Sequence, residues 1–111
     1  MAEEKLPKSF EELVRTSEVP VFVDFWADWC APCHQVAPAV RQLAQEYKGR
    51  IRVVKVNVDK QPHIASKYMV QSIPTLMIFY AGTIVWRFSG ALPYSMLKEN
   101  VDEVLQKLSG P

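Results

Sequence analysis

Residues 21–34 read VFVDFWADWCAPCH, and this stretch decides the fold. Its first six residues carry large apolar side chains at both alternating positions, which is typical of a strand covered on both faces of a sheet. Two cysteines, Cys30 and Cys33, follow where the strand ends. A helical pattern of apolar residues begins directly after them. The stretch therefore predicts a strand that passes through a cysteine-bearing turn into a helix.

The chain after this helix continues the alternation of strands and helices. A second strand is expected over residues 51–58, and the crossover to it is long enough for a right-handed parallel unit. A short helix over residues 61–68 follows. Strands at 75–80 and 83–89 flank the two-residue turn Ala81-Gly82, which predicts an antiparallel hairpin. A last helix is expected from near Pro93.

Upstream of the first strand, Ser9 and Glu12 form a capping box that predicts the start of a short helix. The segment before it is short and polar, so at most Lys5 and Leu6 are expected to pair at a sheet edge. We therefore expect a single α/β domain over residues 1–111. It should have a central mixed sheet of four to five strands with helices on both faces, ending in the antiparallel hairpin and a helix.

The composition of the chain limits the classes of function that it suits. The chain has 111 residues, of which 49% are apolar and 23% charged, as in ordinary globular domains. A formal charge of +1 gives no one-signed field to bind nucleic acid or an anionic membrane surface. The first residues lack the basic start and apolar stretch of a secretory signal, so we expect a reducing cytoplasm. Two cysteines in such a compartment favour redox or metal chemistry over structural bridging.

The position of the cysteines at a helix start has a chemical consequence. If Cys30 caps the helix, Ala31 and Pro32 are its first residues, and the N–H of Cys33 points back at the Cys30 sulfur. That donor and the helix dipole favour an anion there. We therefore expect Cys30 to be an exposed nucleophile with a lowered pKa, and Cys33 to be the buried resolving thiol.

Two metal sites compete with this interpretation. Residues 30–34 satisfy the C-x-x-C-H pattern of covalent haem attachment, but alternating strands and helices do not suit a haem wrap. A zinc site through Cys30, Cys33, His34 and His63 is disfavoured because His34 is adjacent to a ligand. We expect neither a metal nor an organic cofactor, and both histidines at the surface.

Residues 25–33, FWADWCAPC, and residues 72–76, SIPTL, resemble the active-site segment and the cis-proline loop of the thioredoxin family. The similarity covers roughly residues 10–108. Further residues match at the family's spacing: Asp24, Pro38, Lys55, Asp59, Gly82 and Gly90. The chain departs from the family at Ala31, where glycine is usual, and at His34, where lysine is frequent. The resemblance implies a thioredoxin fold and a protein-disulfide reductase.

The resemblance also implies residue roles. The Cys30 thiolate attacks a substrate disulfide, and Cys33 then displaces the reduced substrate. Asp24, on a buried strand face, takes the proton of Cys33 through a water. Lys55 on the adjacent strand is either the charge partner of Asp24 or an ordinary surface lysine.

Substrate binding is implied at an apolar patch around the cysteines. A cis bond at Ile73–Pro74 would turn the Ile73 backbone toward the cysteines for strand-like pairing with a substrate. The expected contact residues are Trp29, Ala31, Pro32, Ile73, Pro74, Gly90 and Ala91. The implied partners are disulfide-containing proteins and an NADPH-dependent thioredoxin reductase, with the chain a monomer.

Two alternatives stay open at this point. Some proteins of this fold act as non-catalytic binding modules through the same patch. Others are oxidases, which tend to carry a histidine between the two cysteines, and this chain has none there.

Overall fold

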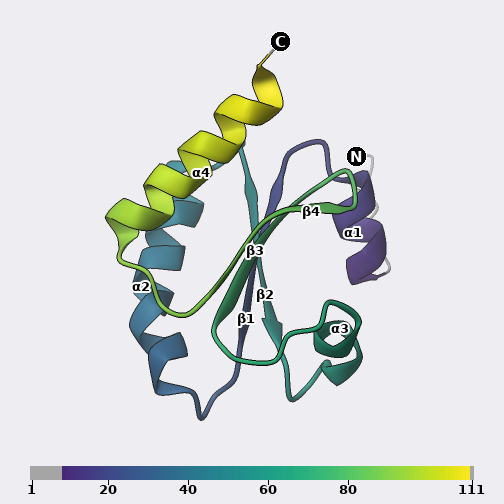
Figure 1. The fold of residues 1–111 in the computed structure, drawn as a ribbon, viewed down its shortest axis with the longest axis vertical. Coiled ribbons are helices and arrows are strands. Elements are labelled where there is room, and N and C mark those ends of the chain that lie inside the picture. Colours follow the sequence, from purple (N-terminus) through teal and green to yellow (C-terminus); the bar gives the residue numbers. More distant parts are fainter. Residues whose placement is uncertain (1–8, 111) are drawn as a thin grey trace, which may run out of the picture.

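The computed structural model describes residues 9–110, which form a four-stranded mixed sheet with helices on both faces (Figure 1). The elements follow one another as α1 (Phe10–Thr16), β1 (Val21–Trp26), α2 (Ala31–Glu46), β2 (Arg52–Asn57), α3 (Pro62–Lys67), β3 (Thr75–Tyr80), β4 (Thr83–Ser89) and α4 (Tyr94–Ser109). The expected order and types of element are confirmed. The edge pairing expected at Lys5 and Leu6 lies outside the described residues.

The strand order is β2-β1-β3-β4. β1 pairs with β2 in parallel through the α2 crossover, and β3 pairs antiparallel with both β1 and β4. The tight turn between β3 and β4 has positive φ at Ala81 (52°) and Gly82 (85°), the backbone that a two-residue hairpin requires. Strand β1, which leads into the two cysteines, is therefore interior, with a neighbour on each side.

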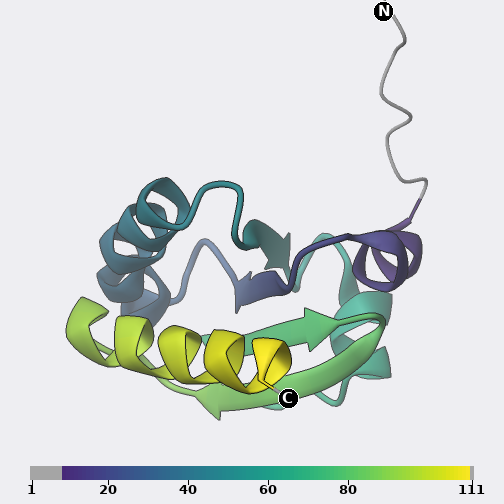
Figure 2. The ribbon, with the colours of Figure 1, turned by 90° about the horizontal axis from the view of Figure 1, so that it is seen from above.

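Alternation along the two central strands divides the core into two layers. Phe22, Leu76 and Ile78 face α2 and α4, where they pack with apolar side chains of both helices. Val23 and Phe79 face the opposite way, toward α1 and α3. Figure 2 shows α2 and α4 together on the left of the view and α1 and α3 together on the right. Because Asp24 shares the parity of Phe22, its carboxyl lies on the α2 side of the sheet.

Two of the helices, α1 and α2, begin at a residue whose side chain accepts a hydrogen bond from an N–H of the first turn. The Ser9 hydroxyl accepts a hydrogen bond from the Glu12 N–H at 3.0 Å and caps α1. Cys30 takes the same position at α2, the 16-residue helix after β1. Among residues 9–110, no helix has the length and apolar character needed to cross a bilayer.

Candidate active site

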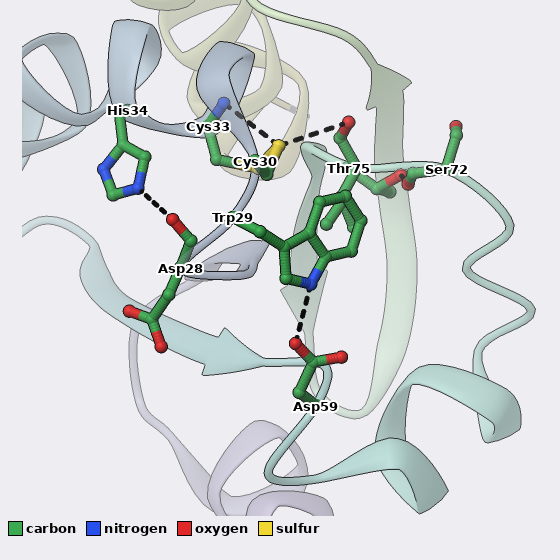
Figure 3. Close-up of a disulfide and its surroundings, with 9 residues drawn as sticks. Asp28, Trp29, Cys30, Cys33, His34, Asp59, Ser72 and Thr75 are labelled. Atoms are coloured by element: carbon green, nitrogen blue, oxygen red, sulfur yellow. Dashed lines mark hydrogen bonds between the residues drawn. A yellow bond between two sulfur atoms is a disulfide. The ribbon is translucent and has the colours of Figure 1, made fainter.

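Cys30 is the N-cap residue of α2, and its sulfur accepts a hydrogen bond from the N–H of Cys33 at 3.2 Å (Figure 3). The backbone of Cys30 is extended, with φ −92° and ψ 105°. Pro32 stands in the first turn, where it has no helical acceptor to lose. The two cysteines are joined in a disulfide. This geometry gives an anionic Cys30 sulfur a backbone donor and the positive end of a four-turn helix.

The exposure of Cys30 differs from the expectation. The sequence predicts an exposed first thiol above a buried second one, but both cysteines are only 3% exposed. They form a small apolar cluster with Ala27, and Trp26, Val58 and Ile73 pack against it. The Cys30 sulfur also lies 3.7 Å from the Ile73 carbonyl oxygen. Neighbouring segments therefore cover most of the Cys30 sulfur. Cys30 differs from Cys33 in its position at the start of α2 and not in its exposure.

Asp24 is fully buried in β1, and neither carboxyl oxygen has a hydrogen-bond partner among the described residues. Burial raises the pKa of this carboxyl from 3.8 to about 6, and the positive charge of Lys55 opposes part of the rise. A carboxyl whose pKa lies near neutrality is suited to accept and return a proton.

Lys55 lies directly beside Asp24 in the parallel register of β1 and β2. Its ammonium stands over the ring of Trp26, 4.5 Å from the ring centroid, and its side chain is exposed. Lys55 thus acts on Asp24 through its charge while its head group stays at the surface.

Trp29, one of the expected contact residues, is 70% exposed on the turn that joins β1 to α2. Its indole N–H donates to the Asp59 carboxylate at 2.8 Å, which ties the turn to the segment after β2 (Figure 3). His34 is also exposed, and its Nε2 lies 2.7 Å from the Asp28 carbonyl oxygen.

The expected contact patch is only partly exposed. Ala31, Pro32 and Ala91 are exposed, whereas Ile73 and Gly90 are half-buried. The Ile73–Pro74 peptide bond is cis, but Pro74 itself is buried and its carbonyl accepts from the Gly90 N–H at 2.8 Å. The ring of Pro74 is therefore largely covered by its own chain, and Ile73 provides more of the accessible surface.

A groove of about 380 Å³ lies beside the disulfide and was not foreseen in full. It is lined by Trp29, Val58, Val70, Gln71, Ser72 and Ile73. Of these, only Trp29 and Ile73 were expected as contact residues, and Ser72 was noted only as part of the SIPTL segment. Val58 could have been predicted, because it follows β2, and residues that follow two parallel strands such as β1 and β2 emerge at the same edge of a sheet. The loop from Val70 to Ser72 shows no periodic pattern that marks it.

The described residues contain no group of three or more His, Cys, Asp or Glu side chains that could hold a metal ion. Of the four side chains considered for zinc, the two cysteines are bonded to each other and the His34 ring faces a carbonyl. His63 is exposed on α3.

Comparison with known proteins agrees with this geometry. The family model described as Thioredoxin matches residues 2–103. Over 86% of this chain and 95% of the relative, the sequence is 55% identical to Thioredoxin 1 of Chlorobaculum tepidum. It is 50% identical to Thioredoxin 1 of a Nostoc species and to thioredoxin of a Synechocystis species, each over 87% of this chain and 91% of the relative. A cysteine pair closing the first turn of α2 is what dithiol–disulfide exchange requires, and the chain belongs to the thioredoxin family as a protein-disulfide reductase.

Proposed function

We propose that Cys30 is the attacking thiolate of this reductase. The reduced Cys30 sulfur attacks one sulfur of a substrate disulfide, forms a mixed disulfide and releases the other substrate sulfur as a thiolate. The observation that carries this assignment is the 3.2 Å hydrogen bond from the Cys33 N–H to the Cys30 sulfur at the N-terminus of α2. The same donor remains available to stabilise the thiolate once the disulfide is reduced.

Cys33 completes the exchange. Its thiolate attacks the Cys30 sulfur of the mixed disulfide, which releases the second substrate sulfur and closes the Cys30–Cys33 bond. Two electrons pass from the cysteine pair to the substrate, and the two substrate thiolates take up protons. Asp24 accepts the proton that Cys33 must lose, because its buried carboxyl, which has no hydrogen-bond partner among residues 9–110, has a pKa of about 6. Lys55 moderates that pKa by its charge.

Substrates dock on the surface around the disulfide. We assign this role to Trp29, Ala31, Pro32, Ile73, Pro74, Gly90 and Ala91, with the buried Pro74 acting through the cis bond that joins it to Ile73. The adjoining groove extends the docking surface along the loop from Val70 to Ser72. An extended disulfide-bearing segment suits this surface, because the Ile73 backbone lies beside the disulfide, with its carbonyl oxygen 3.7 Å from the Cys30 sulfur.

The redox partners of this chain are proposed from its membership of the thioredoxin family. Members of this family reduce protein disulfides and are themselves reduced by a thioredoxin reductase. For this chain we propose a reductase that draws its electrons from NADPH, a single domain over residues 1–111, a monomeric state and a cytoplasmic location.

A turbidity assay of insulin reduction with dithiothreitol tests the assignment. Cys30→Ser should be inactive, since no thiolate remains to attack the substrate. Cys33→Ser should accumulate mixed disulfides through Cys30, visible as adducts on non-reducing gels. Activity of Cys30→Ser equal to that of the parent would contradict the mechanism.

A further inference from the structure

His34 contacts the turn that carries the nucleophile. It lies in the second turn of α2, directly after Cys33, and its side chain is exposed. The ring Nε2 is 2.7 Å from the carbonyl oxygen of Asp28 (Figure 3). A carbonyl oxygen only accepts hydrogen bonds, so Nε2 must carry a hydrogen. That condition is met by the neutral ring protonated at Nε2 and by the imidazolium, so the bond does not require a charged ring.

The Asp28 peptide belongs to a short hydrogen-bonded turn. The N–H of Cys30 donates to the Ala27 carbonyl at 3.2 Å, which closes the turn around Asp28 and Trp29. Trp29 ties one side of the turn to Asp59 through its indole N–H. His34 ties the other side to α2. The turn that delivers Cys30 is therefore attached to its surroundings from two directions.

The His34 ring is itself oriented by packing. It stands edge-on to the indole of Trp26, with ring centroids 6.2 Å apart and planes at 80°. Trp26 is the last residue of β1. One planar side chain from α2 thus touches the end of β1 and bonds to the turn that follows it.

We propose that His34 is a positioning residue for Cys30. By donating from Nε2 to the Asp28 carbonyl, it fixes the 27–30 turn against α2 and keeps the Cys30 sulfur opposite the Cys33 N–H. This inference rests on the proposed role of Cys30 as the attacking thiolate. It assigns the effect of His34 to hydrogen bonding and shape rather than to charge.

Three substitutions separate the donor from the charge. His34→Gln keeps an N–H donor at about the reach of Nε2 and has no charge. His34→Ala has neither, and alanine at an exposed helix position supports folding. His34→Lys introduces a permanent positive charge, with its N–H donors on a flexible stem that does not pack edge-on against Trp26. His63→Ala is the matched control, because His63 is the second histidine and lies on α3.

The test measures the rate of alkylation of Cys30 by iodoacetamide in the reduced variants and, in the oxidised variants, hydrogen exchange of the Cys30 amide. His34→Ala should slow alkylation by about fivefold, the change that loss of one neutral hydrogen bond allows. Its Cys30 amide should exchange faster. His34→Gln should stay within about twofold of the parent on the same scale, and His63→Ala should match the parent.

Two outcomes overturn the proposal. One is a His34→Ala variant with the alkylation rate and amide exchange of the parent. The other is restoration of the rate by lysine but not by glutamine, which would assign the effect to charge. Amide exchange of the oxidised protein does not depend on catalysis. It therefore reports on the His34 contact even if Cys30→Ser proves active and the proposed function fails.

Discussion

Asp24 and Lys55 stand side by side in the parallel register of β1 and β2, yet their head groups occupy different environments. The Asp24 carboxyl is fully buried without a hydrogen-bond partner among the described residues, whereas the Lys55 ammonium lies at the surface over the Trp26 ring. The lysine therefore relieves only part of the cost of ionising the buried acid. Function and stability make opposite demands on Asp24, and both are measurable.

Ionised Asp24 should destabilise the folded protein. Its pKa is about 6 in the folded state against an ordinary value of 3.8, so the folded state binds the proton more tightly. Below pH 3.8 both states are protonated and no cost arises. Above pH 6 both are ionised, and the cost reaches about 3 kcal/mol. Asp24→Asn should therefore raise the free energy of unfolding at pH 7.5 by up to about 3 kcal/mol.

Urea unfolding of the oxidised proteins at several pH values checks this expectation. The gain from Asp24→Asn should shrink as the pH falls from 6 toward 4. Glu99→Gln, which removes an exposed carboxylate on α4, is the matched control and should show no such trend. A gain from Asp24→Asn that is independent of pH would mean that the carboxyl is ionised at its ordinary pKa.

The same substitution should slow catalysis. Asparagine cannot accept the Cys33 proton, so resolution of the mixed disulfide should fall by at least about tenfold at pH 7. In the parent, this step should slow as the pH drops through about 6, because protonated Asp24 is no longer a base. Stopped-flow measurement of substrate release against pH separates this step from the initial attack by Cys30. An unchanged pH profile in Asp24→Asn would remove Asp24 from the proton path.

Tyr47 should contribute to stability and not to chemistry. It is 1% exposed at the end of α2, its hydroxyl donates to Asp102, and Lys98 donates to the hydroxyl at 3.1 Å. Tyr47→Phe should lower the free energy of unfolding by about 1 kcal/mol through the lost hydrogen bonds. Tyr47→Ala should lower it by about 3 kcal/mol or more, because it also leaves a cavity between α2 and α4.

Urea unfolding again provides the measurement, with Tyr80→Phe as the control because Tyr80 is 40% exposed on β3. Insulin reduction per folded molecule should be the same in Tyr47→Phe and the parent. A loss of activity without a loss of stability would show that this helix contact reaches the active site.

Patterns of short range were enough to predict most of the fold. The bounds of β3 and β4 follow from one apolar run interrupted by Ala81-Gly82, and the start of α2 follows from Pro32 after a cap residue. These features depend on neighbours within a few positions, which the sequence displays directly. The same holds for Asp24, whose burial is indicated by the apolar residues two positions away on each side.

Contacts between distant segments were not predictable in the same way. The coverage of Cys30 depends on Ile73, which lies 43 positions away. The groove is formed by residues that follow β2 together with a loop that has no repeating pattern. The exposure of Cys30 and of the groove residues depends on how these loops pack against one another. The sequence therefore predicted the two cysteines more reliably than it predicted which side chains are exposed around them.

Arg87 should govern the order of the groove-lining loop. Its guanidinium donates to the carbonyls of Tyr68 and Met69, at 2.6 and 2.7 Å, and so ties the end of α3 to β4. Met69 is held there with φ at 57°, a backbone region that non-glycine residues seldom adopt. Arg87→Ala releases both carbonyls to solvent, so the loop from Val70 to Ile73 should sample more conformations and bind substrate less well.

Hydrogen exchange of the amides in residues 70–73 and the KM for a disulfide peptide measure the two effects of Arg87→Ala. Exchange should accelerate, and KM should rise by about fivefold if the loop contributes the equivalent of one hydrogen bond to docking. Arg41→Ala on the exposed side of α2 is the control. Arg87→Lys should fall between the parent and Arg87→Ala, because an ammonium lacks the planar fork that reaches both carbonyls at once. If exchange accelerates while KM stays at the parent value, the loop is ordered by Arg87 but does not take part in docking.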